Sequence, residues 1–127
     1  MHHNDLNCAE TMLWAANEYY HLGMSKTALH AASAFGGGMG VEAACGALTG
    51  GLMALGVMFS TERSHRDQKL TDLRDRFVTR FRSHFGSTEC HDVKIKHRSA
   101  LRGCEPIVEE TATLFEQIVA ETRGTLE

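Results

Sequence analysis

The chain has 127 residues, of which 43% are hydrophobic and 23% are charged, so it can bury a core without help from disulfides. One proline, twelve glycines and an aromatic content of 7% argue against a β-sandwich and against a disordered chain. The net charge of −3 indicates no particular class of partner. We therefore expect one all-α domain over residues 1–127, built as a compact bundle of four to five helices.

The first expected helix begins near the N-terminus and carries Cys8 in its first turn. Asn7 or Asp5 can cap this helix, because a short polar side chain accepts a hydrogen bond from a free backbone amide there. Apolar side chains recur every three or four positions over residues 9–20, which is typical of a helix with one buried face. Gly23 is expected to end it.

Residues 35–59 are the least ordinary stretch of the chain. A glycine run at residues 36–40 predicts a break in the backbone, and the apolar residues that follow predict a glycine-rich central helix that carries Cys45. Glycine costs about 1 kcal/mol relative to alanine inside a helix, so something must compensate for Gly46 and Gly50. Their spacing places both on one face, where a neighbouring helix can approach closely. The stretch is too interrupted for a convincing membrane span, and we expect a buried helix.

After the central helix, a further helix is expected to follow Ser60 and Thr61, both of which are good capping residues. Its apolar residues lie on one stripe at spacings of three or four: Leu70, Leu73, Phe77, Phe81 and Phe85. Gly86 is expected to end this helix, and the turn that follows contains Cys90. Residues 92–102 show no clean period, so they predict a short helix or a loop.

The last expected helix begins near Pro106, because proline is favoured in the first turn of a helix. Cys104 therefore lies at a helix N-terminus, where free amides and the helix dipole stabilise a thiolate. Cys8 has the same predicted setting, and Cys90 follows a glycine and residues that favour a helix start. Cys45 is expected to lie deeper, inside the central helix.

The four cysteines are the main candidates for chemistry. The N-terminal residues lack the basic and apolar pattern of a signal peptide, so we expect a cytoplasmic protein, in which structural disulfides are rare. Metal ligation and reversible thiol chemistry are the better explanations. No two cysteines are two residues apart, unlike those of zinc ribbons and bacterial ferredoxins, so spacing alone does not identify a metal.

Two further features have less specific interpretations. Most lysines and arginines lie in residues 62–102, which can mark a surface for nucleic acid or for an acidic protein. Acidic residues are interspersed among them, so a solvated helix face is the favoured interpretation. His91 follows Cys90 directly and is a candidate hydrogen-bond donor to sulfur or an exchangeable ligand.

Five strings along the chain resemble the four-cysteine redox-active protein family named for its C-G-A-x-x-G motif (C_GCAxxG_C_C). In order they are N-C-A-E from Asn7, F-G-G-G-M-G from Phe35, C-G-A-L-T-G from Cys45, F-G-S-T-E-C from Phe85 and C-E-P-I-V from Cys104. The family is found mostly in anaerobic bacteria and archaea. It is related to the N-terminal domain of split-Soret cytochromes, for which an iron–sulfur centre has been proposed.

The resemblance implies a redox protein that holds an iron–sulfur cluster, [2Fe–2S] or [4Fe–4S], through Cys8, Cys45, Cys90 and Cys104. Electron transfer or redox sensing is then expected, rather than an enzyme with a substrate of its own. A redox protein is the expected partner and a homodimer is an open alternative, whereas nucleic acid and membrane are not expected. A structural zinc site and a metal-free thiol–disulfide switch remain the alternative functions.

Overall fold

The computed structural model describes residues 6–60 and 67–123, and helices account for most of both segments. The α-helices are α1 (Cys8–Tyr20), α2 (Lys26–Leu29), α3 (Gly46–Phe59), α4 (Gln68–Phe85), α5 (Cys90–His97) and α6 (Glu105–Thr122). A short 3₁₀ turn, His30–Ala32, follows α2, and a π-type turn, Gly38–Glu42, precedes α3. The all-α prediction is confirmed, although the described residues form six α-helices where four or five were expected.

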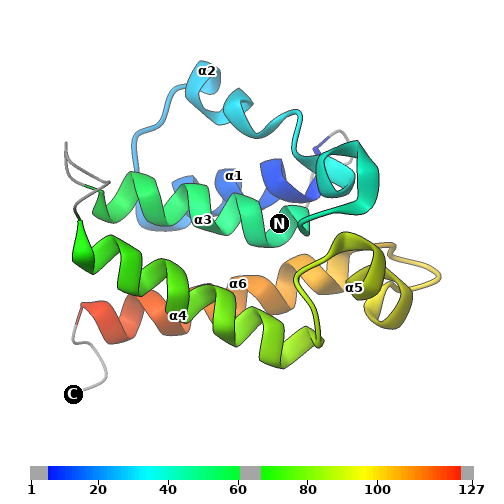
Figure 1. The fold of residues 1–127 in the computed structure, drawn as a ribbon. Coiled ribbons are helices and arrows are strands. Elements are labelled where there is room, and N and C mark those ends of the chain that lie inside the picture. The colour runs from blue at the N-terminus through cyan, green and yellow to red at the C-terminus, as the bar shows by residue number, and fades with distance from the viewer. Residues whose placement is uncertain (1–5, 61–66, 124–127) are drawn as a thin grey trace.

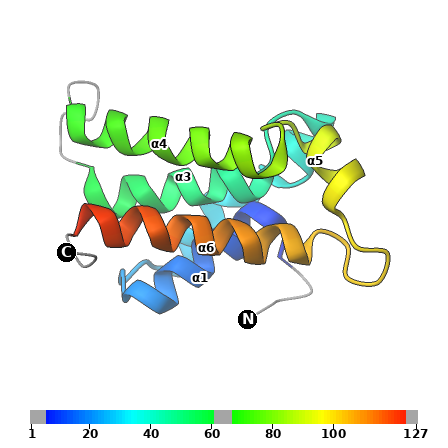
Figure 2. The same ribbon diagram turned by 90° about the horizontal axis from the view of Figure 1, so that it is seen from below.

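Four long helices form the bundle, with α1, α3, α4 and α6 each packed against the next and α6 closing the ring against α1. Helices α1, α3 and α6 run in one direction, and α4 runs in the opposite direction (Figures 1 and 2). The first turns of the three parallel helices consequently lie at one end of the molecule. The short helix α5 lies at that same end.

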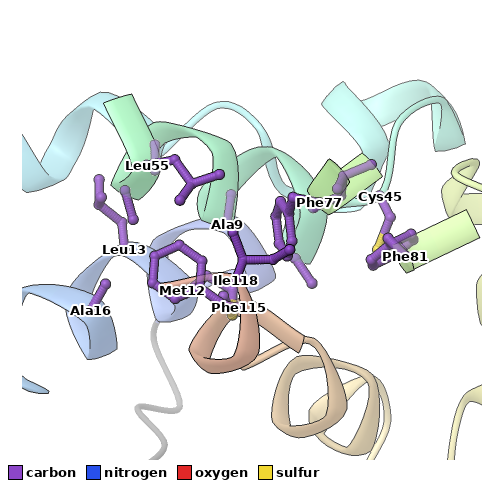
Figure 3. Close-up of a cluster of buried hydrophobic side chains, with 14 of the residues drawn as sticks. Ala9, Met12, Leu13, Ala16, Cys45, Leu55, Phe77, Phe81, Phe115 and Ile118 are labelled. Atoms are coloured by element: carbon purple, nitrogen blue, oxygen red, sulfur yellow. The ribbon is translucent and has the colours of Figure 1, made fainter. Parts of the chain in front are cut away.

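The core fills the space between the four long helices (Figure 3). The predicted stripe on α4 is confirmed, with Phe77 and Phe81 fully buried. The ring of Phe77 meets that of Phe115 on α6 edge to face, with centroids 5.8 Å apart, a favourable arrangement for aromatic pairs. Cys45 belongs to the same buried cluster, so the core reaches the end of the bundle where α3 begins.

Close contact between α1 and α3 explains the glycines of α3. A Cβ atom added at Gly50 would lie 2.4 Å from the carbonyl oxygen of Ala9, and one at Gly46 would lie 3.1 Å from the Cβ of Cys8. Alanine on one helix and glycine on the other thus let the two backbones approach each other. The predicted close approach at both glycines is confirmed, and it brings Cys8 to the start of α3.

Two predicted helix ends differ in the structure. His21, in the left-handed conformation at φ 54°, caps the C-terminus of α1 instead of Gly23. Ser60 ends α3, and Asp67 caps α4 by accepting a hydrogen bond from the amide of Leu70 at 3.0 Å. The other candidate cap, Thr61, lies outside the described residues. Each difference has the same cause, because several polar or glycine residues near a helix end compete for one role.

Candidate functional site

The four cysteines line one cavity of about 90 Å³ at the end of the bundle where α1, α3 and α6 begin. Cys45 and Cys90 are buried, whereas Cys8 and Cys104 are half-buried. The remaining lining residues are Gly37, Gly46, Val93, Lys94 and Ile107. The structure thus brings together residues that are far apart in the sequence. Their role as ligands stays a prediction.

Every cysteine lies at the start of a helix. Cys8 and Cys90 are the first residues of α1 and α5, and Cys45 and Cys104 are the N-cap residues of α3 and α6. The prediction for Cys8 and Cys104 is confirmed. The prediction that Cys45 lies inside the central helix is wrong, because α3 begins only at Gly46. Four helix N-termini, each with a partial positive charge, therefore surround the cavity.

A capping box fixes the start of α1 and hence the position of Cys8. The side chain of Asn7 accepts a hydrogen bond from the amide of Glu10 at 2.8 Å, and the Glu10 carboxylate accepts one from the amide of Asn7 at 3.0 Å. The Asn7 side chain also donates to the carbonyl of Ser33 at 2.8 Å. These bonds hold Cys8 against the loop that leads to α3.

The glycine-rich loop before α3 holds Cys45 and Cys90 together through backbone bonds. The amide of Cys45 donates to the carbonyl of Thr88 at 2.8 Å, and the amide of Cys90 donates to the carbonyl of Ala43 at 2.5 Å. A Cβ atom added at Gly38 would lie 2.7 Å from the Cβ of Cys90. Glycine is therefore required there, because the loop passes directly over this cysteine.

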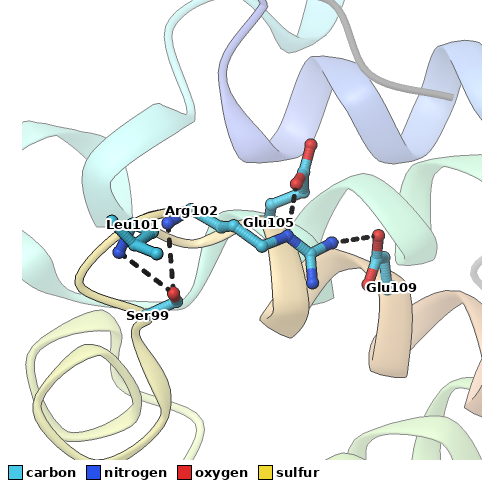
Figure 4. Close-up of polar contacts among 5 residues, drawn as sticks. All are labelled: Ser99, Leu101, Arg102, Glu105 and Glu109. Atoms are coloured by element: carbon cyan, nitrogen blue, oxygen red, sulfur yellow. Dashed lines mark hydrogen bonds and ion pairs between the residues drawn. The ribbon is translucent and has the colours of Figure 1, made fainter.

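A tight turn and an arginine clamp position Cys104 (Figure 4). The Ser99 hydroxyl accepts hydrogen bonds from the amides of Leu101 and Arg102, at 3.2 and 3.1 Å. The Arg102 guanidinium then donates to Glu105 at 2.7 Å and to Glu109 at 2.5 Å. Both carboxylates belong to α6, so the clamp joins the turn to the helix that Cys104 caps.

Cys8 and Cys104 are in direct contact, and the contact polarises them. The Cys8 thiol donates a hydrogen bond to the Cys104 sulfur, which raises the pKa of Cys8 and lowers the pKa of Cys104 to about 6. Burial opposes the lowering at Cys104, while Arg98 and Lys94 favour its thiolate. In the metal-free protein, the pair therefore favours a thiolate at Cys104 and a thiol at Cys8.

The other two cysteines are held as thiols by burial. Burial raises the pKa of Cys45, although the amides of Ala47 and Leu48 donate hydrogen bonds to its sulfur and act in the opposite direction. Burial likewise raises the pKa of Cys90, and the charge of Lys94 opposes this effect. At Cys45 and Cys90, burial thus disfavours a bare thiolate, whereas the nearby amides and the charge of Lys94 favour negative charge on sulfur.

This polarisation predicts that iodoacetamide alkylates Cys104 before the other cysteines in the metal-free protein. Because its pKa is lowered to about 6, the reactive thiolate persists at neutral pH and is lost only as the pH falls below that value. A free thiol would instead gain reactivity near pH 8.5, approximately.

Peptide mass spectrometry between about pH 5 and pH 9 measures the alkylation rate at each cysteine. Cys8→Ala, which removes the donated bond, should shift the midpoint for Cys104 upward; equal rates at all four sites would contradict the prediction.

His91 does not face the sulfurs. Its Nδ1 atom pairs with the carboxylate of Glu42 at 2.9 Å, and its side chain is 60% exposed. Glu42 also accepts a hydrogen bond from Lys94 at 2.5 Å, and these two contacts lower the pKa of its carboxyl. Glu42 therefore joins the loop to α5. Sequence reasoning missed both Glu42 and Lys94, because only the fold places them beside the cavity.

The donor set of the cavity is one that iron–sulfur groups use. Four thiols are the usual ligand set of [2Fe–2S] and [4Fe–4S] clusters, and about 90 Å³ is several times the space of about 10–15 Å³ that one water needs. Within residues 6–60 and 67–123, no group of three or more His, Cys, Asp or Glu side chains is arranged to hold one metal ion.

Comparisons with known proteins agree with the resemblance seen in the sequence. No curated protein and no solved structure matches the chain. None of the helices in the described part of the chain is long and apolar enough to span a membrane. The family model described as "Putative redox-active protein (C_GCAxxG_C_C)" matches residues 6–118, a segment that contains all four cysteines. The chain therefore belongs to this four-cysteine redox-active protein family.

Proposed function

We propose that this protein carries electrons, or senses redox state, by means of an iron–sulfur cluster held by Cys8, Cys45, Cys90 and Cys104. The observation that carries the proposal is the convergence of four cysteines, each at a helix N-terminus, on one cavity. Family membership supports the redox part of the proposal.

The charges around the cavity favour a negatively charged group inside it. A cluster with four thiolate ligands carries net negative charge, and each helix N-terminus provides about half a positive elementary charge. Lys94 lies at the wall of the cavity, where its ion pair with Glu42 offsets part of its positive charge. The same features would make a poor site for a neutral ligand, whereas they lower the free energy of a buried anion.

The chain's own residues set the properties of such a centre. A bound cluster would supply one-electron chemistry, and its potential depends on burial, on hydrogen bonds to sulfur and on nearby charge. Amide donors at Cys45 and the cation of Lys94 favour the more negative, reduced state. Val93 and Ile107, both buried, keep water from the inner side of the cavity.

Anaerobic reconstitution with iron and sulfide tests the proposal. The protein should gain a visible chromophore and bound iron with matching sulfide, and serine at any one of the four cysteine positions should bleach or weaken the colour. His91→Ala is the matched control, because His91 faces Glu42, and it should keep the full spectrum. Failure of the wild-type protein to assemble a chromophore without oxygen would overturn the proposal, and tightly bound zinc without colour would favour the structural alternative.

A thiol–disulfide switch is the second candidate, because Cys8 and Cys104 are already hydrogen-bonded to each other. Their two thiols would form one disulfide, and the two electrons and two protons released would reduce a disulfide of a partner or of glutathione to two thiols. Treatment of metal-free protein with oxidised glutathione, followed by peptide mapping without reductant, should then show the pair Cys8–Cys104. Rapid, reversible formation of this pair in a protein that binds no iron would favour the switch.

A further inference from the structure

Exposed apolar residues gather around the cysteine end of the molecule. Val41 is 75% exposed, Ile95 68% and Leu101 96%, although large apolar side chains usually contribute to a core. Val41 lies on the loop before α3, Ile95 on α5 and Leu101 on the turn that leads to Cys104. All three segments are therefore direct neighbours of cavity-lining residues.

Backbone and side-chain contacts hold these segments at the same end (Figure 1). Glu42, next to Val41, binds His91 and Lys94 of α5. The turn after α5 is closed by paired backbone hydrogen bonds between Ser99 and Gly103, at 2.8 and 2.9 Å. The apolar residues are thus presented on a fixed framework.

Lysines and arginines lie among these residues, together with Asp92, which lines the same surface hollow as Ile95 and Lys96. Residues 93–104 contain four lysines and arginines and no carboxylate. Lys94 and Arg102 are engaged in ion pairs with Glu42 and with residues of α6. No ion pair of Lys96 or Arg98 is found within the part of the chain that the structure describes, and both residues are exposed. The molecule is acidic as a whole, with a net charge of −3, so this basic area is a local feature.

At Ile95 and Lys96, the width of α5 separates this area from the cavity. Val93 and Lys94 line the cavity, while the next two residues of the helix, Ile95 and Lys96, face solvent. A helix with its side chains is about 10–12 Å across. A redox centre placed against this surface would therefore lie close to the four cysteines.

We propose that Val41, Ile95, Leu101, Lys96 and Arg98 form a docking surface for a small acidic electron-transfer protein. The apolar residues would form the dry centre of the contact, and the two cations would attract acidic residues at its rim. One electron would pass between the centre held by the cysteines and the redox centre of the partner, with no bond made or broken. The identity of the partner rests on the proposed redox function, whereas the docking surface itself does not.

Binding to a plant-type [2Fe–2S] ferredoxin, used as the acidic probe, tests the docking surface. Calorimetric titration of both the metal-free and the reconstituted protein should show an affinity that falls with added salt. The double variant Lys96→Glu with Arg98→Glu should lose about tenfold or more in affinity, and Leu101→Asp should also weaken binding. The matched control is Lys26→Glu with Lys69→Glu, which makes the same charge change on α2 and at the start of α4, and it should stay within about twofold of wild type.

Three results would overturn the docking proposal: no binding at low salt, equal losses in the charge-reversal and control variants, or tighter binding of a duplex oligonucleotide than of the ferredoxin. The proposal would also be overturned if the wild-type protein were a dimer and Leu101→Asp made it a monomer, because the surface would then bind a second copy of the chain. Calorimetric titration needs no chromophore. Ferredoxin binding by a protein that assembles no cluster would therefore support the proposed docking surface and refute the proposed iron–sulfur cluster. In the reconstituted protein, reduction by the ferredoxin should slow in the double variant while reduction by dithionite does not.

Discussion

Replacing Phe77 by alanine is expected to lower the free energy of unfolding by about 3–5 kcal/mol. Phe77 is fully buried, and its ring contacts Phe115 across the bundle. A Cβ atom at Gly51 would lie only 2.6 Å from the ring, so α3 packs directly onto it. Removing the ring would leave a cavity between three helices, because their backbones cannot close over it without losing other contacts.

Urea unfolding of the metal-free protein under reducing conditions measures this loss. Thr79→Ala, two residues away on the exposed side of α4, is the control and should change stability by no more than about 0.5 kcal/mol. A loss of less than about 1 kcal/mol for Phe77→Ala would mean that the core tolerates a void at its centre, contrary to the packing described above.

Replacing Gly50 by alanine is expected to destabilise the protein by about 1–3 kcal/mol, although alanine is the better helix former. The added Cβ would lie 2.4 and 2.9 Å from the carbonyl oxygen and Cα of Ala9. These are backbone atoms that cannot rotate away, so α1 and α3 would have to separate. Cys8 precedes Ala9, and the same displacement should reduce assembly of a chromophore at the site.

Gly56 provides the matched control within the same helix. A Cβ atom there would meet no atom within 4 Å, so Gly56→Ala should stabilise the protein by about 1 kcal/mol through helix propensity alone. Thermal unfolding of the two variants should therefore move in opposite directions. Stabilisation by both substitutions would show that α1 and α3 are not in the close contact described.

Apolar periodicity and capping residues predicted several helices well, because both patterns depend on residues only a few positions apart. The stripe on α4, the glycine that ends it and the start of α6 near Pro106 all follow from periodicity and capping. The close approach at Gly46 and Gly50 could also be expected, since glycine in a helix needs a reason. These features depend on side-chain size and hydrogen bonding over one or two turns.

The start of α3 could not be predicted from periodicity and capping. Met39 and Glu42 adopt left-handed conformations, with φ of 63° and 58°, which few residues other than glycine do. Only contacts made by the folded chain, such as those of Glu42 with α5, can hold a residue there. Pattern reasoning therefore continued the helix through Cys45.

The gathering of the cysteines depends on tertiary structure for a similar reason. Spacing along the chain gave no metal signal, and the expectation of one shared site came from the family resemblance. In the structure Cys8, Cys45 and Cys104 meet because α1, α3 and α6 run in parallel, and the bond from the Cys90 amide to the Ala43 carbonyl adds Cys90. Helix direction is decided by the whole chain. His91 illustrates the converse, because its position beside Cys90 in sequence does not place it beside sulfur.

The two halves of the cavity differ in how a local unfolding event would affect them. Cys45 and Cys90 are joined by two backbone hydrogen bonds between their own segments, so loosening of an outer helix leaves this half intact. Cys8 and Cys104 belong to separate helices and also line a second, surface pocket of about 230 Å³. Fraying at the first turn of α1 or α6 would consequently open only this half. If the site holds the cluster proposed above, iron and sulfide would enter, and oxygen would attack, from the side of Cys8 and Cys104, while Cys45 and Cys90 would stay in place.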